Sequence, residues 1–332
     1  MRVLPLLALS LLVVAVPPVA AKQRPIKLNV TAGHVKKGTE KQVCFPITFP
    51  RRHAVDVERV EIFVKGGSHH VHLYRPVSGE VMLPNPDKTY SPAGPGNRKP
   101  RECAFAIDFS HWELVAASQT ADLNWPLHPG VGIHFEPRQQ LMVQTHFVNT
   151  GFGSASLEVK GRTRAKMVLY PMEASSVTAH GGALFGQDRT VAVPPGTSVR
   201  SSNCKLTGDA ADGHEKTIMA LTGHYHFRGV GYRIWRTLAD GTRGELVYLQ
   251  EGYDDPKFQR YAPGELVLKP GEGIEWECTW QNDSDQTFFF GPDTGKNEHC
   301  NLFGFYYPTD TPLESMDCVH REDGTEVRTI RR

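Results

Sequence analysis

The strongest constraint on the fold of this chain is a series of short runs in which apolar and polar residues alternate. Clear examples are residues 57–64, 140–148, 230–235 and 274–280, which are rich in β-branched and aromatic side chains. Alternation with a period of two is typical of β-strands with one buried face. Proline and glycine punctuate the chain at short intervals and favour turns. Because no segment carries a convincing amphipathic helix, the sequence predicts an all-β fold of antiparallel β-sandwiches.

The length of 332 residues indicates two domains. Residues 1–21 have the pattern of a secretory signal peptide, with a basic start, an apolar run and a small-residue cleavage site. The apolar run is short for a membrane span, an uncleaved anchor being the alternative, and no later stretch is apolar enough. We therefore expect a secreted or periplasmic chain without a membrane span after signal removal, and domains at 22–175 and 176–332.

Charge and cysteine content narrow the class further. The 37 basic and 36 acidic residues nearly cancel, and no basic stripe exists, so nucleic acid is not an expected partner. Six cysteines in a secreted chain predict three disulfides, with free thiols as the alternative. Two cysteines lie in the first half and four in the second, so each half can pair internally. The pairings that we choose are Cys44–Cys103, Cys204–Cys318 and Cys278–Cys300.

Histidine is concentrated in short clusters within strand-like segments. The clustered histidines are His69, His70, His72, His146, His224 and His226, and His299 stands directly before Cys300. Imidazole is the commonest protein ligand of redox copper. On a strand, His224 and His226 project from the same face and can share one ion. Several such clusters in a secreted chain predict a copper protein.

These segments resemble the copper type II, ascorbate-dependent monooxygenases, the family of peptidylglycine α-hydroxylating monooxygenase and dopamine β-monooxygenase. The resemblance covers nearly the whole mature chain, and the spacing of Cys278 and Cys300 fits a disulfide of that family. Four motifs carry it: His69-His70 before an apolar strand, Leu141 to His146-Phe147, His224-Tyr225-His226, and Glu298-His299-Cys300-Asn301-Leu302 followed by Tyr306-Tyr307.

The resemblance implies two tandem jelly-roll-like sandwich domains that each hold one copper and face each other across a solvent-filled cleft. It implies a copper-dependent monooxygenase that hydroxylates a C–H bond of a small-molecule substrate with dioxygen and a reductant such as ascorbate. The implied ligands are His69, His70 and His146 for the electron-transfer copper, and His224, His226 and His299 for the oxygen-binding copper. No catalytic residue is assigned beyond these ligands, and no signal of an oligomeric state is found.

The chain departs from the family at His299, which occupies a methionine position. A thioether is soft and favours Cu(I), whereas imidazole is a better partner for Cu(II). A non-hydroxylating copper-binding or redox protein of the same fold is therefore the alternative function. A third is an extracellular sandwich protein whose histidines are structural or bind zinc.

Substrate recognition also departs from the peptide-amidating branch. Thr222 and Phe303 stand where that branch has an arginine and a tyrosine for a substrate carboxylate, and Asn301 is kept. We expect Asn301 and Phe303 to contact substrate in a more apolar pocket, so that a peptide ending in glycine is a poor candidate.

Strand geometry leaves one ligand assignment open. Neighbouring residues on a regular strand face opposite ways, so His69 and His70 can share an ion only at a strand end or bulge, which Gly66-Gly67 would permit. By spacing alone, His70 and His72 are a competing pair. Otherwise His72 is either an extra neighbour of the site or a surface histidine, and we prefer the second interpretation. Met142 is interpreted as a core residue. The histidines interpreted as non-ligands are His34, His53, His111, His128, His134, His180, His214 and His320.

Overall fold

The computed structural model describes residues 23–65, 69–78, 82–84, 90–92, 99–103, 111–149, 162–205, 214–253 and 256–330. In these segments the regular structure is β-strand, apart from a 3-10 turn at Ala174–Ser176. Among the described residues, no helix is long and apolar enough to cross a membrane. The predicted signal peptide and Gly66-Gly67 lie outside these segments. The predicted all-β sandwich fold is confirmed.

The first half forms two facing sheets. One contains, in order, β1 (Ile26–His34), β12 (Arg162–Pro171), β3 (Val55–Lys65), β10 (Val131–Phe135) and β13 (Ala179–His180), with β9 (Asp122–Pro126) beside β3. The other contains β7 (Arg101–Glu102), β2 (Thr39–Thr48), β11 (Gln140–Asn149), β4 (His70–Pro76) and β8 (Trp112–Ser118). A ribbon of β5 (Met82–Pro84) and β6 (Tyr90–Pro92) accompanies them. All these pairings are antiparallel except that of β10 with β13.

The second half repeats this plan. One sheet contains β20 (Gln259–Arg260), β17 (Lys216–His224), β24 (Asn301–Tyr307), β14 (Gly182–Asp188), β25 (Ser315–Arg321) and β26 (Gly324–Ile330), with β21 (Val267–Leu268) beside β17. The other contains β16 (Gly196–Lys205), β22 (Gly273–Asn282), β18 (Gly229–Thr237) and β19 (Arg243–Glu251). A ribbon of β15 (Ala192–Val193) and β23 (Phe288–Phe289) completes it, and β14 and β25 run parallel.

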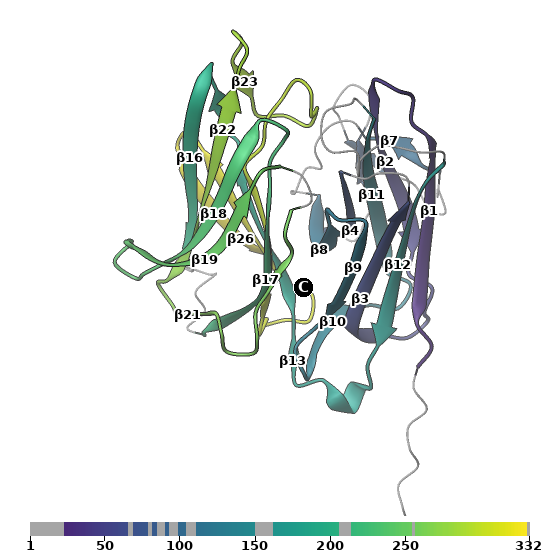
Figure 1. Cartoon of the computed structure of the whole chain (residues 1–332). Coiled ribbons are helices and arrows are strands. Elements are labelled where there is room, and N and C mark those ends of the chain that lie inside the picture. Colours follow the sequence, from purple (N-terminus) through teal and green to yellow (C-terminus); the bar gives the residue numbers. More distant parts are fainter. Residues whose placement is uncertain are drawn as a thin grey trace, which may run out of the picture.

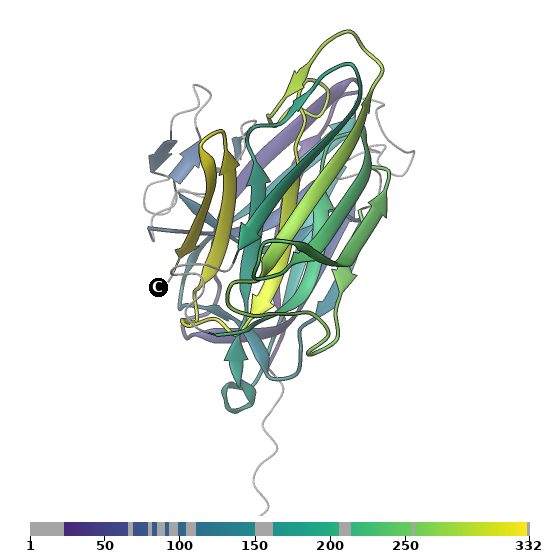
Figure 2. The same cartoon turned by 90° about the vertical axis from the view of Figure 1, so that its left-hand side faces the viewer.

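The two sandwiches stand side by side (Figure 1), and the second lies in front of the first when the view is turned (Figure 2). Each sheet draws its described strands from one side of Gly181 only. The short strand β13 pairs with β10 of the first sandwich, although the expected boundary at 175/176 places it with the second. β13 is therefore the link between the halves.

The six cysteines form the three predicted disulfides, Cys44–Cys103, Cys204–Cys318 and Cys278–Cys300. Each disulfide joins two cysteines of the same half of the chain, one in the first half and two in the second, as expected from the distribution of the cysteines. Each is worth about 2–4 kcal/mol of stability, chiefly through restriction of the unfolded chain. Cys278–Cys300 ties β22 to the residue before β24, and so anchors the segment that carries His299.

Burial patterns show which sheet faces meet. On β1, buried and exposed residues alternate from Ile26 to Ala32, because only one face of this strand covers a core. By contrast β4, β8 and β14 are buried at every position. A strand buried on both faces has a second layer against each face. The sheet with β4 and β8 therefore packs on its own sandwich partner and on the sheet with β14.

Apolar side chains fill this contact between the halves. Phe185, Met219 and Phe305 of the second half belong to the same buried cluster as the core of the first half. Trp125 on β9 is 1% exposed, and its ring centroid lies 4.4 Å from that of Phe305 and 5.5 Å from that of Phe258. The halves thus share a hydrophobic core, which fixes the position of one against the other.

We predict that Trp125→Ala lowers the free energy of unfolding by about 3–5 kcal/mol, because it leaves a large cavity in this shared core. Urea denaturation followed by circular dichroism measures the change. The control is Trp235→Ala on β18, a partly exposed ring under the Arg243 guanidinium, with an expected loss of about 1 kcal/mol or less. Equal losses for the two variants would contradict a shared core at Trp125.

Candidate metal centre

Histidines from both halves converge between the two sandwiches. His69 precedes β4, His70 begins β4 and His146 lies on β11. From the second half, His224 ends β17, His226 follows it, and His299 precedes β24. All six side chains are buried. The structure thus brings together every histidine that the sequence nominated as a ligand.

The histidines of the first half form one potential metal site. His69, His70 and His146 each offer a ring nitrogen within 4.8 Å of those of the other two. His146 lies opposite His70 in the pairing of β11 with β4, and its Nδ1 is 3.3 Å from His70 Nε2. His69 reaches the same place because it lies in a bend just before the strand, where side chains need not alternate.

The histidines of the second half lie directly against this group. His224 and His226 form a second potential site, and the residue that completes it within 4.8 Å is His69. The ring centroid of His299 is 4.2 Å from that of His226 and 5.4 Å from that of His224. His69 therefore belongs to both groups, with its ring centroid 4.7 Å from that of His224.

This continuity differs from the solvent-filled cleft that the family resemblance implies. Two glutamine side chains of the first half donate hydrogen bonds to backbone carbonyl oxygens of the second half and so hold the halves together. Gln119 Nε2 donates to the Gly223 carbonyl oxygen at 2.8 Å, and Gln42 Nε2 donates to the Pro292 carbonyl oxygen at 3.2 Å. Together with the shared core, these bonds leave the rings in contact.

Three of the imidazoles have a hydrogen-bond acceptor on the side away from the cluster. His146 Nε2 lies 2.6 Å from Glu40 Oε2, His224 Nδ1 lies 2.5 Å from Gln119 Oε1, and His226 Nδ1 lies 2.8 Å from the Asn297 carbonyl oxygen. Metal-binding histidines usually donate their outer N–H to such a group, which fixes the tautomer and aims the other nitrogen at the ion. Sequence reasoning missed Glu40 and Gln119, since neither lies in a histidine motif.

Several ring nitrogens of these histidines are buried without a hydrogen-bond partner. They are His69 Nε2, His70 Nδ1, His72 Nε2, His226 Nε2 and His299 Nδ1. Buried polar atoms are nearly always satisfied by protein or solvent, so each such exception calls for an explanation, of which a bound ion is one. Since each of the two three-histidine groups offers ring nitrogens within 4.8 Å of one another, the residues present fit a copper or zinc ion.

Burial also fixes the protonation state of the cluster. Loss of solvent lowers the pKa of His69, His70, His224 and His299 well below its usual range, and the neighbouring imidazoles lower it further. Burial lowers the pKa of His72 to about 3 and that of His226 to about 4. At neutral pH these rings are therefore neutral, which is the form that binds a metal.

Glu298 anchors the segment before His299. Its carboxylate accepts hydrogen bonds from the His226 backbone N–H at 3.1 Å and from Trp280 Nε1 at 3.0 Å, and it lies 3.2 Å from Arg228 Nη1. Burial raises the pKa of Glu298 to about 7, against the opposing effect of Arg228. These bonds fix the backbone on both sides of the second histidine group.

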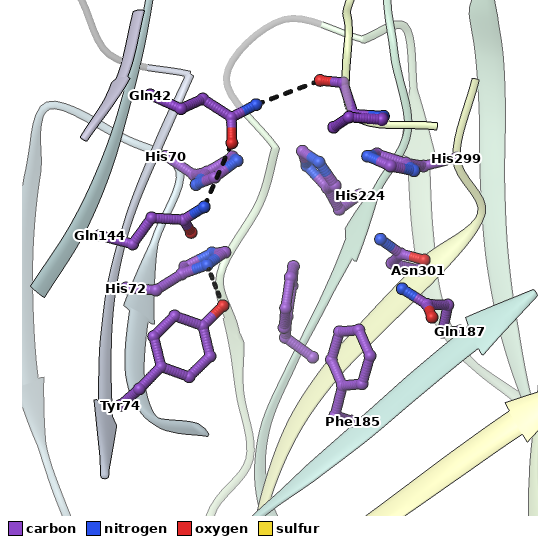
Figure 3. Close-up of a pocket in the computed structure, with 12 residues that line it drawn as sticks. Gln42, His70, His72, Tyr74, Gln144, Phe185, Gln187, His224, His299 and Asn301 are labelled. Carbon is purple, nitrogen blue, oxygen red and sulfur yellow. Dashed lines mark hydrogen bonds between the residues drawn. The ribbon is translucent and has the colours of Figure 1, made fainter. Parts of the chain in front are cut away.

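A pocket opens beside the cluster (Figure 3). His70, His72, His224 and His299 line it on the metal side. The other described residues around it are Gln42, Tyr74, Gln144, Phe185, Gln187, Pro292, Asn301 and Phe303, and none of the described residues that line it is charged. Asn301 and Phe303, the expected substrate contacts, are both buried there, and Asn301 Oδ1 has no hydrogen-bond partner.

The interpretation of His72 as a surface histidine is wrong. Its side chain is 3% exposed, and its ring is stacked on that of His70 with centroids 4.3 Å apart. Its Nδ1 lies 2.7 Å from the Tyr74 hydroxyl oxygen. His72 is thus a neighbour of the metal cluster that faces the pocket. Met142 is buried in the core of the first half, as predicted.

Comparisons with known proteins bear on the second half. Residues 184–330 match the family model of the C-terminal domain of copper type II ascorbate-dependent monooxygenases. This segment includes His224, His226 and His299, so the match supports a relationship of the second sandwich to that family. No curated protein matches the chain.

Solved structures add little. A peptide-N(4)-(N-acetyl-β-D-glucosaminyl)asparagine amidase is 7% identical at a TM-score of 0.39, over 88% of this chain and 98% of that chain. Particles derived from infectious bursal virus contain a chain that is 10% identical at a TM-score of 0.20, over 95% of this chain and 78% of that chain. Both TM-scores are too low to support an argument about fold or function.

We predict that Gln119→Leu weakens copper binding about 10–100-fold, because His224 loses the group that orients its ring. Competition with a Cu(I) chelator measures the affinity. Gln140→Leu is the matched control, since Gln140 is exposed and bonds only at the far end of β11. An affinity that is unchanged in Gln119→Leu would show that His224 does not depend on this hydrogen bond for its orientation.

Proposed function

We propose that this chain is an extracytoplasmic, copper-dependent monooxygenase that hydroxylates a C–H bond of a small molecule with dioxygen and a one-electron reductant such as ascorbate. The observation that carries the proposal is the convergence of buried imidazoles from both halves, with ring nitrogens unpartnered, beside a pocket whose described lining residues are all uncharged. The family match of residues 184–330 supports the same chemistry. Three disulfides fit an oxidising compartment.

The ligands that we assign follow the two halves. His69, His70 and His146 hold the first copper, and His224, His226 and His299 hold the second. Bound copper supplies the one-electron redox chemistry that dioxygen activation needs. Since His69 also lies within reach of His224 and His226, its position couples the two sets of ligands.

The protein itself contributes orientation, desolvation and a substrate surface. Glu40, Gln119 and the Asn297 carbonyl each hold the outer N–H of one imidazole, so the rings are aimed before any ligand binds. The apolar contact between the halves excludes water from around the cluster, which limits side reactions of activated oxygen.

The pocket indicates the class of substrate. Phe185 and Phe303 offer apolar contact surface, and Gln187 and Asn301 offer amide groups for orientation. No lysine or arginine is among the described residues that line the pocket, so none of these residues is placed to pair with a substrate carboxylate. We therefore propose a small neutral or weakly basic substrate with an apolar body.

The second candidate is a copper-binding or redox protein of the same fold without hydroxylation. The observation that favours it is the presence of imidazole at His299, where a thioether would favour Cu(I). Copper content does not separate the two candidates, whereas oxygen consumption does.

We predict that the copper-loaded protein holds about two coppers per chain and consumes dioxygen only with both ascorbate and a small apolar amine or aromatic compound. Elemental analysis and an oxygen electrode test this, with mass spectrometry of the product for one added oxygen atom. His226→Ala serves as the inactive control, since it removes one ligand. Copper binding with reduction and re-oxidation, but no oxygenated product from the panel, would favour the second candidate.

We predict that His299→Met introduces a copper–sulfur contribution in the X-ray absorption spectrum of the reduced protein and raises the preference for Cu(I). The physical reason is the softness of the thioether. The matched control is His72→Met, at a buried position of the same pocket that we do not assign as a ligand. A sulfur contribution in the wild-type spectrum, or none in His299→Met, would remove His299 from the ligand set.

A further inference from the structure

A third group of possible metal ligands lies outside the central cluster, where the chain passes from one sandwich to the other. Asp56 lies on β3, His134 on β10 and His180 on β13, and each offers a ligand atom within 4.8 Å of the other two. Their side chains are 15%, 14% and 27% exposed. The group is therefore shielded yet within reach of solvent ions. The sequence analysis interpreted both histidines as non-ligands, because neither belongs to a histidine cluster in the sequence.

Strand pairing brings these residues to one face. His134 lies directly opposite Asp56 in the pairing of β10 with β3. His180 lies opposite Gly132, which is two residues before His134 and so on the same face of β10. A Cβ atom on Gly132 would lie 2.9 Å from Asp56 Cβ, so glycine leaves the space that the carboxylate occupies beside the two rings.

The two imidazoles point at the same carboxylate oxygen. His134 Nδ1 is 2.9 Å and His180 Nε2 is 3.2 Å from Asp56 Oδ1. Around a tetrahedral zinc ion, with bonds of about 2.0–2.2 Å, ligand atoms are separated by about 3.3–3.6 Å. An outward movement of a few tenths of an ångström would therefore make room for an ion.

A second carboxylate lies on the outer side of His134. Glu136 Oε1 is 3.5 Å from His134 Nε2, while Nδ1 of the same ring faces Asp56. A carboxylate behind the outer nitrogen of a histidine, with the inner nitrogen turned to the ligand position, is the usual surrounding of a histidine that binds zinc. Glu136 is not one of the three proposed ligands, so its contact with His134 is a separate observation that is consistent with metal binding by His134.

We propose that Asp56, His134 and His180 bind a divalent transition-metal ion, with zinc as the best match, and that the ion fixes the linker between the two sandwiches. Two imidazoles, one carboxylate and a solvent molecule give the four ligands that zinc prefers. This site is separate from the proposed copper centre and does not depend on it.

The linker role follows from the position of His180. It is the last residue of β13, which connects the halves beside β10 (Figure 1). Its carbonyl oxygen accepts hydrogen bonds from the Thr309 backbone N–H at 3.0 Å and from Thr309 Oγ1 at 3.2 Å. The second half thus holds the backbone of His180, and a metal on its ring would hold it to β3 and β10 as well.

The test compares zinc content and thermal stability in the full chain. The protein is stripped with a chelator, equilibrated with zinc sulfate, desalted and assayed by mass spectrometry of the metal. We expect Asp56→Asn and His180→Gln each to bind one zinc per chain fewer than the wild type. His128→Gln is the control, because His128 also lies at the junction, with Nε2 2.8 Å from the Tyr261 carbonyl oxygen, but outside the group.

Two further measurements keep the result specific. The central histidines can also take zinc, so the comparison is repeated in the His224→Ala/His226→Ala background, where the same difference of one ion is expected. In that background, zinc should raise the melting temperature of the protein and of its His128→Gln variant by several degrees. The rise should be smaller in the His180→Gln variant, because the zinc site at Asp56, His134 and His180 is lost.

Two results would overturn the proposal of a zinc site. If Asp56→Asn and His180→Gln bind as much zinc as the wild type in both backgrounds, the group is not a metal site. If Asp56→Asn lowers the melting temperature by the same amount with and without zinc, the three residues form only a hydrogen-bonded charge cluster. His180 is partly exposed, so His180→Gln keeps the test usable if the change at Asp56 disturbs folding.

Discussion

The apolar packing of one sandwich on the other is the interaction on which the rest of this structure depends. Strands such as β4, β8 and β14 are buried on both faces, and Trp125 and Phe305 meet across the contact. Burial of each large apolar side chain favours this arrangement by about 1.5–3 kcal/mol. Without this packing, no comparable interaction would hold the histidines of the two halves close together.

This packing also determines the chemistry of the histidine cluster. Desolvation keeps the imidazoles of His69, His70, His224, His226 and His299 neutral, and it makes every unsatisfied ring nitrogen costly unless a ligand satisfies it. The hydrogen bonds that cross the contact both join the halves and orient histidine side chains. Gln119 joins the halves through the Gly223 carbonyl and orients His224, and Glu40 lies against His146 while it accepts a hydrogen bond from Thr294 Oγ1. Alignment of the halves and orientation of the ligands are therefore linked.

Much of this arrangement could be predicted from local patterns. The strand periodicity indicated the all-β sandwich. The distribution of cysteines between the halves allowed all pairing to stay within each half, which the structure confirms, but it left three possible pairings for the four cysteines of the second half. His224 and His226 are two residues apart, and the sequence predicted that they lie close together; the structure brings their ring centroids to 5.9 Å, although β17 ends at His224 and His226 lies just beyond the strand. The position of His69 beside His70 required a strand end, which only the folded chain could show to be at His70.

The sequence by itself determined which residues are capable of binding a metal and which secondary structure carries them, because residue chemistry and strand periodicity are local properties. Tertiary structure alone decided that His69 lies against both histidine groups, that His72 is buried, and that Asp56 meets His180 across 124 positions of the chain. These contacts depend on strand order, register and the packing of two sheets, which arise from the balance of many distant apolar contacts. No local pattern in the chain encodes such a balance, and for that reason isolated histidines could not be assigned to a site before the fold was known.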